Sequence, residues 1–138
     1  MLSVMVPLYN EQGNISILCE RLKNVLNDIS ENWEIILIDD GSTDNTRSVA
    51  SKIIKESKKI KGVFLRRNYG QTPAMMAGFQ YSSGDIIISM DGDLQNDPKD
   101  IPHLIKKLDE GYDVVSGWRK DRKDDKWLRV IPSRIANK

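Results

Sequence analysis

The chain has 138 residues, of which 39% are hydrophobic and 30% are charged, a balance typical of one soluble globular domain with its own core. Its net charge of +1 gives no basic field of the kind that non-specific nucleic-acid binding requires, so we expect no nucleic-acid partner. The single cysteine, Cys19, excludes an internal disulfide and indicates a reducing compartment, and no apolar run approaches the roughly 20 residues of a membrane span.

Short apolar runs alternate along the chain with segments of helical periodicity. In the first half we expect a strand at Leu2–Val6, a helix from about Asn14 to Ser30, a strand at Glu34–Ile38, and a helix that Thr43 or Asp44 caps. After a break at Gly62 we expect a strand at Val63–Leu65, a helix at Thr72–Tyr81, a strand at Ile86–Ile88, a helix that Asp97 caps and Pro98 opens, and a strand at Asp113–Trp118.

This alternation predicts an α/β fold with a mostly parallel sheet and helices on both faces. The chain has no linker and no internal repeat, so residues 1–138 are predicted to form a single domain. In such sheets ligands bind beyond the carboxyl ends of the strands, which makes the residues after each strand the informative ones. Those residues are Pro7–Glu11, Asp39–Ser42, Arg66–Gly70, Asp91–Asp93 and Gly117–Arg119.

Two carboxylates, Asp91 and Asp93, follow the apolar run Ile86–Ile88 with only Gly92 between them. Carboxylates at the end of a buried strand need hydrogen bonds or a cation to offset the loss of solvation. Gly92 allows the backbone to bend, so that both carboxylates can approach one hard divalent ion, and Gln95 offers a third oxygen. The alternative is an ordinary turn, because Asp-Gly is a common turn dipeptide.

Ordered motifs along the chain carry a resemblance to a known family. They are Pro7–Glu11, Asp39–Ser42, Arg67–Gly70 with Ala74 and Gly78, and Asp91–Gln95. Together they resemble the motifs of inverting family 2 glycosyltransferases with the GT-A fold. The stretches Gly117–Arg119 and Arg129–Asn137 resemble polyprenyl-phosphate sugar transferases, which include dolichyl-phosphate mannose synthases and bactoprenol glucosyltransferases. The resemblance covers the whole chain and implies that it is the N-terminal part of a longer enzyme, often one with membrane helices.

The resemblance implies a nucleoside pocket lined by Pro7, Tyr9 and Glu11. Tyr9 would pack on the base or the sugar, and Glu11 would accept hydrogen bonds from ribose hydroxyls. Asp39 would accept a hydrogen bond from an N–H of the base. We rank Asp39 above Asp40, for which N-terminal capping together with Ser42 is an equal alternative.

The resemblance also implies a metal and phosphate site. Asp91, Asp93 and Gln95 would hold Mg²⁺ or Mn²⁺ against the diphosphate leaving group, which makes Asp91 a nucleotide-binding residue as well. The family's usual Asp-Ala-Asp is Asp-Gly-Asp here, which changes no ligand. Arg119, Arg129 and Ser133 match positions that meet phosphates of donor or acceptor, so Arg119 and Arg129 join the two aspartates as candidate catalytic residues.

The function implied is metal-dependent inverting transfer of a sugar from a UDP- or GDP-linked donor to a polyprenyl phosphate. The complete protein would then work at the cytoplasmic face of the membrane. Two alternatives stay open: a family 2 transferase with a saccharide or other soluble acceptor, and a non-catalytic nucleotide-sugar-binding module. A haloacid-dehalogenase-type phosphatase also places D-x-D after a strand, but it expects Thr or Val at the position of Gln95 and has no place for the Asp39–Ser42 stretch.

Overall fold

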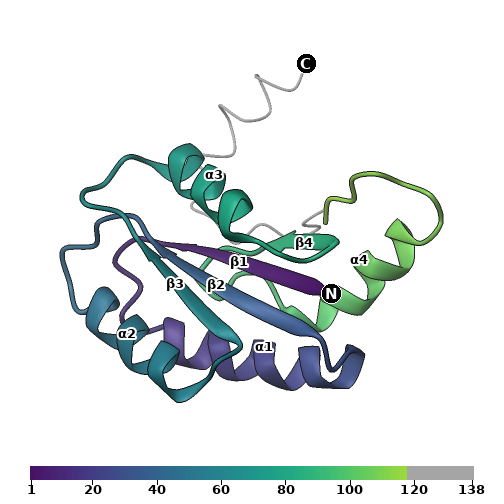
Figure 1. Ribbon diagram of the computed structural model, residues 1–138, viewed down its shortest axis with the longest axis horizontal. Helices are drawn as coiled ribbons and strands as arrows, with labels where there is room; N and C mark the ends of the chain where they lie inside the picture. Colours follow the sequence, from purple (N-terminus) through teal and green to yellow (C-terminus); the bar gives the residue numbers. More distant parts are fainter. Residues whose placement is uncertain (118–138) are drawn as a thin grey trace, which may run out of the picture. The chain divides into compact units, whose positions relative to one another are not determined.

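The computed structural model describes residues 1–117, which fall into two units that divide after Pro102 and are described separately. The first unit contains the sheet and most of the helices (Figure 1). Its elements in chain order are β1 (Leu2–Leu8), α1 (Ile15–Ile29), β2 (Trp33–Asp39), α2 (Thr46–Glu56), β3 (Ile60–Phe64), α3 (Gln71–Tyr81), β4 (Ile86–Ser89) and the 3₁₀ turn η1 (Pro98–Asp100), after which α4 (Ile101–Leu108) begins.

The four strands form one parallel sheet in the order β3-β2-β1-β4. Leu2 of β1 pairs with Trp33 of β2 on one side and with Ile86 of β4 on the other. Every residue of β2 is buried, because α1 and α2 lie on one face of the sheet and α3 lies on the other (Figure 1). The predicted fold class, a mostly parallel sheet with helices on both faces, is confirmed.

Helix α3 packs closely on the sheet because it presents small residues to it. Ala74 is buried in a cluster with Met5 of β1 and with two isoleucines of β2, Ile36 and Ile38. One turn further along, a Cβ atom on Gly78 would lie 2.8 Å from the sulfur of Met5 and 3.1 Å from Ile38 Cδ1, so a larger residue would require the packing between α3 and the sheet to shift. The close packing fixes the start of α3 at the carboxyl ends of the strands.

The helix and strand starts differ from the sequence expectation at three places. Asp97 accepts from the N–H of Lys99 at 3.0 Å as predicted, but η1 precedes the α-helical turns, which begin at Ile101. Asp44 accepts from the N–H of Thr46 at 2.9 Å, yet it lies one residue before the cap position. Gly62 does not separate two elements: it lies inside β3, which begins at Ile60 and not at Val63, and a Cβ there would lie 2.4 Å from Ile54 Cδ1 of α2.

Helix α1 is amphipathic, and its spacing predicts one apolar stripe of Ile15, Leu18, Leu22, Val25, Leu26 and Ile29. Four of these residues are buried, Val25 and Ile29 are partly buried, and Cys19 is buried beside Leu18. Burial raises the pKa of the Cys19 thiol from 9.0 to about 11, and the nearby Lys23 charge offsets only part of this rise. Cys19 is therefore a small hydrophobic residue of the core, as expected.

Alkylation of Cys19 by iodoacetamide at pH 8 is expected to be at least about a hundredfold slower in the folded protein than in the urea-unfolded chain. A pKa near 11 lowers the thiolate fraction by about that factor, and burial restricts access further. Mass spectrometry of timed samples measures the two rates. Equal rates would show that Cys19 is exposed and contradict the packing of α1.

At the amino ends of the strands, the buried carboxylate of Glu34 joins several segments. It accepts from Ser3 Oγ at 2.6 Å and from the N–H of Ser83 at 2.7 Å, and it forms an ion pair with Lys61 Nζ at 2.6 Å. Burial alone would raise the pKa of Glu34, but the hydrogen bonds from Lys61, Ser3 and Ser83 lower it below its usual value. The loop before β4 is therefore fixed to the start of the sheet.

The second unit begins at His103, within α4, and Gly111 with a φ of 103° follows that helix. The predicted strand at Asp113–Trp118 is wrong for the residues that can be judged: 113–117 form no strand, and Val114 is 85% exposed. Strand propensity alone does not make a strand, because the backbone needs a hydrogen-bonded neighbour. Trp118 lies outside the described residues, and the single-domain assignment stays a prediction.

Candidate functional site

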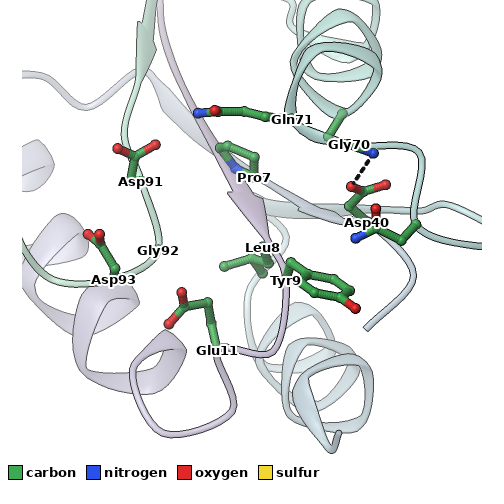
Figure 2. Close-up of a pocket in the computed structure, with 12 residues that line it drawn as sticks. Pro7, Leu8, Tyr9, Glu11, Asp40, Gly70, Gln71, Asp91, Gly92 and Asp93 are labelled. Atoms are coloured by element: carbon green, nitrogen blue, oxygen red, sulfur yellow. Dashed lines mark hydrogen bonds between the residues drawn. The ribbon is translucent and has the colours of Figure 1, made fainter. Parts of the chain in front are cut away.

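A pocket of about 300 Å³ opens at the carboxyl ends of the strands in the first unit. Residues from the loops after β1, β2, β3 and β4 contribute to it, as expected for a parallel α/β sheet. It is lined by Pro7, Leu8, Tyr9, Glu11, Asp40, Asn68, Gly70, Gln71, Ala74, Asp91, Gly92 and Asp93. In Figure 2 the carboxylates of Asp91 and Asp93 lie at one side of the pocket and Tyr9 lies beside Asp40 at the other.

The loop that carries Tyr9 and Glu11 is held by the loop after β2. Asn10, whose φ of 56° is unusual for a residue with a side chain, accepts from the N–H of Thr43 at 2.9 Å. The N–H of Glu11 donates to Thr46 Oγ1 at 2.8 Å. These bonds fix the backbone that follows Tyr9, whose side chain is about half exposed at the pocket.

The loop after β4 brings Asp91 and Asp93 to the same pocket because glycine separates them. A Cβ on Gly92 would lie 2.7 Å from Leu8 Cδ2 and 3.3 Å from Glu11 Cγ, so a larger residue would require these side chains or the loop to shift. The sequence assigned Gly92 only a bend in the backbone. The structure adds close packing, which places the carboxylates opposite Glu11 (Figure 2).

The pair Asp91 and Asp93 suits a divalent ion that is shared with a ligand. Among residues 1–117, no group of three or more His, Cys, Asp or Glu side chains is placed to hold a metal by protein atoms alone. Mg²⁺ is commonly bound by one or two carboxylates together with substrate phosphates, and two carboxylates on one wall of a pocket fit that donor set. Gln95 is not among the lining residues, and its backbone N–H donates to Asp93 Oδ1 at 3.0 Å.

Asp39 lies behind the pocket, not in its lining. Its side chain is 1% exposed, accepts from Arg47 Nε at 2.9 Å and from the N–H of Ser42 at 3.2 Å. Arg47 also donates to the carbonyl of Leu65 at 2.5 Å, so this group joins α2 to the ends of β2 and β3. Base recognition by Asp39 stays a prediction.

Asp39→Asn is expected to lower the free energy of unfolding by about 1–3 kcal/mol, because an amide cannot keep the charge-assisted bond to Arg47. Urea denaturation measures this. Arg47 is half exposed, so solvent weakens the pair and the lower end of the range is favoured. The sequence alone predicts a change in nucleotide affinity with little effect on melting temperature. Unchanged stability with weaker nucleotide binding would restore that interpretation.

Asp40, which we ranked below Asp39 as a nucleotide contact, lines the pocket. It is 4% exposed and accepts from the backbone N–H groups of Tyr69 and Gly70 at 2.8 and 2.9 Å. These bonds place the Asp40 carboxylate at the amino end of α3, whereas Ser42 Oγ accepts from the N–H of Asn10 at 3.0 Å. The lining residues Asn68, Gly70, Gln71 and Ala74 come from the segment that Asp40 contacts, and the motif beginning at Arg67 was their only sequence signal.

The structure thus brings together Pro7, Tyr9, Glu11, Asp91 and Asp93 from the predicted set. Three predicted phosphate-contacting residues, Arg119, Arg129 and Ser133, lie outside the described residues.

Comparison with known proteins decides the family. The model of "Glycosyl transferase family 2" matches residues 3–137. The chain belongs to glycosyl transferase family 2. Two curated relatives agree with this family 2 assignment: an undecaprenyl-phosphate 4-deoxy-4-formamido-L-arabinose transferase of Aeromonas hydrophila subsp. hydrophila, 43% identical over 100% of this chain, and a dodecaprenyl-phosphate galacturonate synthase of Rhizobium johnstonii, 47% identical over 99%. The chain spans 42% and 41% of their lengths.

Solved structures support the fold of this family 2 chain. A mannosyltransferase of Pyrobaculum calidifontis, in complex with GDP-Man and Mn²⁺, has a TM-score of 0.68 at 22% identity, covering 78% of this chain and 32% of that one. A glucosyl-3-phosphoglycerate synthase of Mycobacterium tuberculosis, in complex with Mn²⁺, UDP and phosphoglyceric acid, has a TM-score of 0.62 at 24% identity, covering 78% and 38%.

Proposed function

We propose that the protein is a metal-dependent inverting glycosyltransferase that moves a sugar from a nucleotide diphosphate to a polyprenyl phosphate. The observation that carries this is the convergence of Asp91 and Asp93 with Tyr9 and Glu11 in one pocket. Two carboxylates at one side and an aromatic ring at the other match a ligand with a diphosphate and a nucleoside. The names of the two curated relatives support the polyprenyl-phosphate acceptor.

The residues of the pocket suit distinct parts of such a donor. The half-exposed ring of Tyr9 offers an apolar surface for the base or ribose, beside Pro7. The Glu11 carboxylate, which accepts from Asn14 Nδ2 at 2.8 Å, has further acceptor capacity for a ribose hydroxyl. Asp39 is proposed to accept a hydrogen bond from an N–H of the base, for which its carboxylate, bonded here to Arg47 outside the pocket lining, would have to turn into the pocket.

Asp91 and Asp93 are proposed to hold Mg²⁺ or Mn²⁺ with the donor's diphosphate, and Gln95 to add an oxygen. A bound divalent ion would neutralise the diphosphate as it leaves the anomeric carbon. Attack by the acceptor from the opposite side of that carbon would invert its configuration. A phosphate acceptor is already anionic, so it needs little activation by a base.

Arg119, Arg129 and Ser133 are proposed to bind donor or acceptor phosphates, with the two arginines as catalytic residues. A guanidinium can bind a phosphate through two parallel hydrogen bonds, and a serine hydroxyl adds a donor. No helix among the described residues combines the length and apolar character that crossing a bilayer requires. We propose that the protein meets its lipid acceptor at the cytoplasmic face of the membrane.

Calorimetric titration of UDP, GDP and their sugars, each with and without Mn²⁺, tests the donor half. We expect metal-dependent binding of one nucleotide class, and binding of neither would overturn the proposal. A transfer assay with a polyprenyl phosphate and with soluble saccharides tests the acceptor half, with the Aeromonas relative as positive control. Transfer to a saccharide alone would replace the lipid acceptor, and nucleotide binding without any transfer would indicate a binding module.

A further inference from the structure

We propose that Asp40 is a positioning residue that holds the segment from Asn68 to the start of α3 in the shape that receives the nucleotide sugar. This inference rests on the proposed function of the pocket. Asp40 contacts that segment through both of its carboxylate oxygens: Oδ1 accepts from the N–H of Tyr69 at 2.8 Å and Oδ2 from the N–H of Gly70 at 2.9 Å.

The segment that Asp40 holds contributes a third of the pocket lining, namely Asn68, Gly70, Gln71 and Ala74 of the twelve lining residues. Gly70 is the N-cap residue of α3, and it has no side chain with which to bond the first turn. Asp40 supplies a carboxylate there from another loop, and a negative charge is favourable beside the amino end of a helix. The conformation of this segment therefore depends on a residue about 30 positions earlier in the chain.

The residue next to Asp40 shows how closely the two loops meet. Gly41 has a φ of 65°, and a Cβ built on it would lie 2.2 Å from the carbonyl carbon of Arg67 and 2.4 Å from the nitrogen of Asn68. Gly41 thus allows the segment to lie close to the loop after β2. Asp40 orients the backbone of the segment by accepting from two of its N–H groups. The side chain of Asp40 is 4% exposed, so water competes weakly for these bonds.

Asp40→Asn tests this role with little change of volume. Each N–H bonds a different carboxylate oxygen, so an asparagine keeps one acceptor and turns an amide NH₂ toward the other N–H. We expect amide hydrogen exchange at Tyr69 or Gly70 to accelerate by about tenfold or more, and the affinity for UDP or GDP with Mn²⁺ to fall by about tenfold or more.

Glu34→Gln is the matched control, because Glu34 is also a 4% exposed carboxylate that holds a distant loop, through the N–H of Ser83. It lies at the opposite ends of the strands and outside the pocket lining. We expect it to lower the melting temperature and leave nucleotide affinity within about twofold of the unmodified chain. Should Asp40→Asn fail to fold, Asp40→Ser removes both carboxylate oxygens, places no amide NH₂ against the two N–H groups, and leaves room for a water molecule.

The combinations of results separate the possibilities. Faster exchange with weaker binding, in Asp40→Asn alone, supports the positioning role. Weaker binding with unchanged exchange would show that Asp40 contacts the nucleotide directly, and faster exchange with unchanged binding would show a purely structural role; either overturns the inference while the proposed function stands. An equal loss of affinity in Glu34→Gln would show a general effect of instability and also overturn it. If the unmodified chain binds neither nucleotide, the proposed function itself fails and the inference fails with it.

Discussion

Asp93→Ala is expected to weaken Mn²⁺-dependent binding of the nucleotide by about a hundredfold or more while the protein stays folded. A divalent ion that bridges a carboxylate pair and a diphosphate contributes several kcal/mol, and a hundredfold loss corresponds to about 2.7 kcal/mol. Asp93 lines the pocket together with Asp91. Its hydrogen bond with the N–H of Gln95 is exposed, so water can bond this N–H when the carboxylate is removed. Calorimetry with and without Mn²⁺ measures the loss.

Two further variants make this experiment specific. Asp93→Asn keeps an oxygen for the N–H of Gln95, so it preserves the local turn while removing the charge. Asp97→Ala removes a carboxylate from the same loop at a residue outside the pocket lining, where Asp97 only caps η1. Metal-dependent affinity should fall in both Asp93 variants and persist in Asp97→Ala. A loss of only threefold in Asp93→Ala would favour an ordinary turn over a metal site.

Gly41→Ala is expected to lower the free energy of unfolding by about 3 kcal/mol or more. The φ of 65° costs an L-residue about 1–2 kcal/mol, and the new methyl group would meet backbone atoms of Arg67 and Asn68 at less than 3 Å. Backbone cannot move aside as a flexible side chain can, so the loop after β3 must shift. Such a loss is a large fraction of the 5–15 kcal/mol typical of a domain, and urea denaturation measures it.

Gly13→Ala is the matched control for this prediction. Gly13 lies in the loop after β1, its φ is not in the left-handed region, and a Cβ there meets nothing within 4 Å. We expect a change of at most about 0.5 kcal/mol, or a slight gain in stability from the stiffer unfolded chain. Equal destabilisation by the two substitutions would show that the contact between Gly41 and the loop after β3 is not what stabilises the fold there.

The fold was predictable because its signals are local and repeated. The apolar runs and the helical stripes gave β1, β2, β4 and α1 almost to the residue, and parallel connection of strands through helices restricts the sheet to few arrangements. The prediction at Gly62 was wrong because glycine usually ends helices and strands. Here its lack of a side chain instead leaves space for Ile54 of α2 to pack against β3. The prediction of a strand after Gly111 was wrong because a local apolar run does not show whether a neighbouring strand is present to pair with it.

The site was predictable at the level of motifs, and less so at the level of single side chains. The motifs identify the loops that meet, and five of the predicted residues do line one pocket. The sequence cannot show which of two adjacent aspartates faces the pocket, because that depends on the direction in which β2 ends. Asp39 turns toward Arg47 and Asp40 toward Tyr69, and both partners come from other elements.

Strand β4 is fixed at both of its ends. The number of residues in the strand therefore determines where the loop after it enters the pocket. Before the strand, the N–H of Gly84 donates to Ser3 Oγ at 2.8 Å; after it, the N–H of Met90 donates to the carbonyl of Met5 at 3.0 Å. A strand advances about 3.3 Å per residue and alternates its side chains between the two faces. The four residues of β4 therefore set both the height and the facing direction of Asp91. Substitutions among its isoleucines change packing alone, whereas one residue more or fewer would carry the acidic pair out of reach of Tyr9 and Glu11.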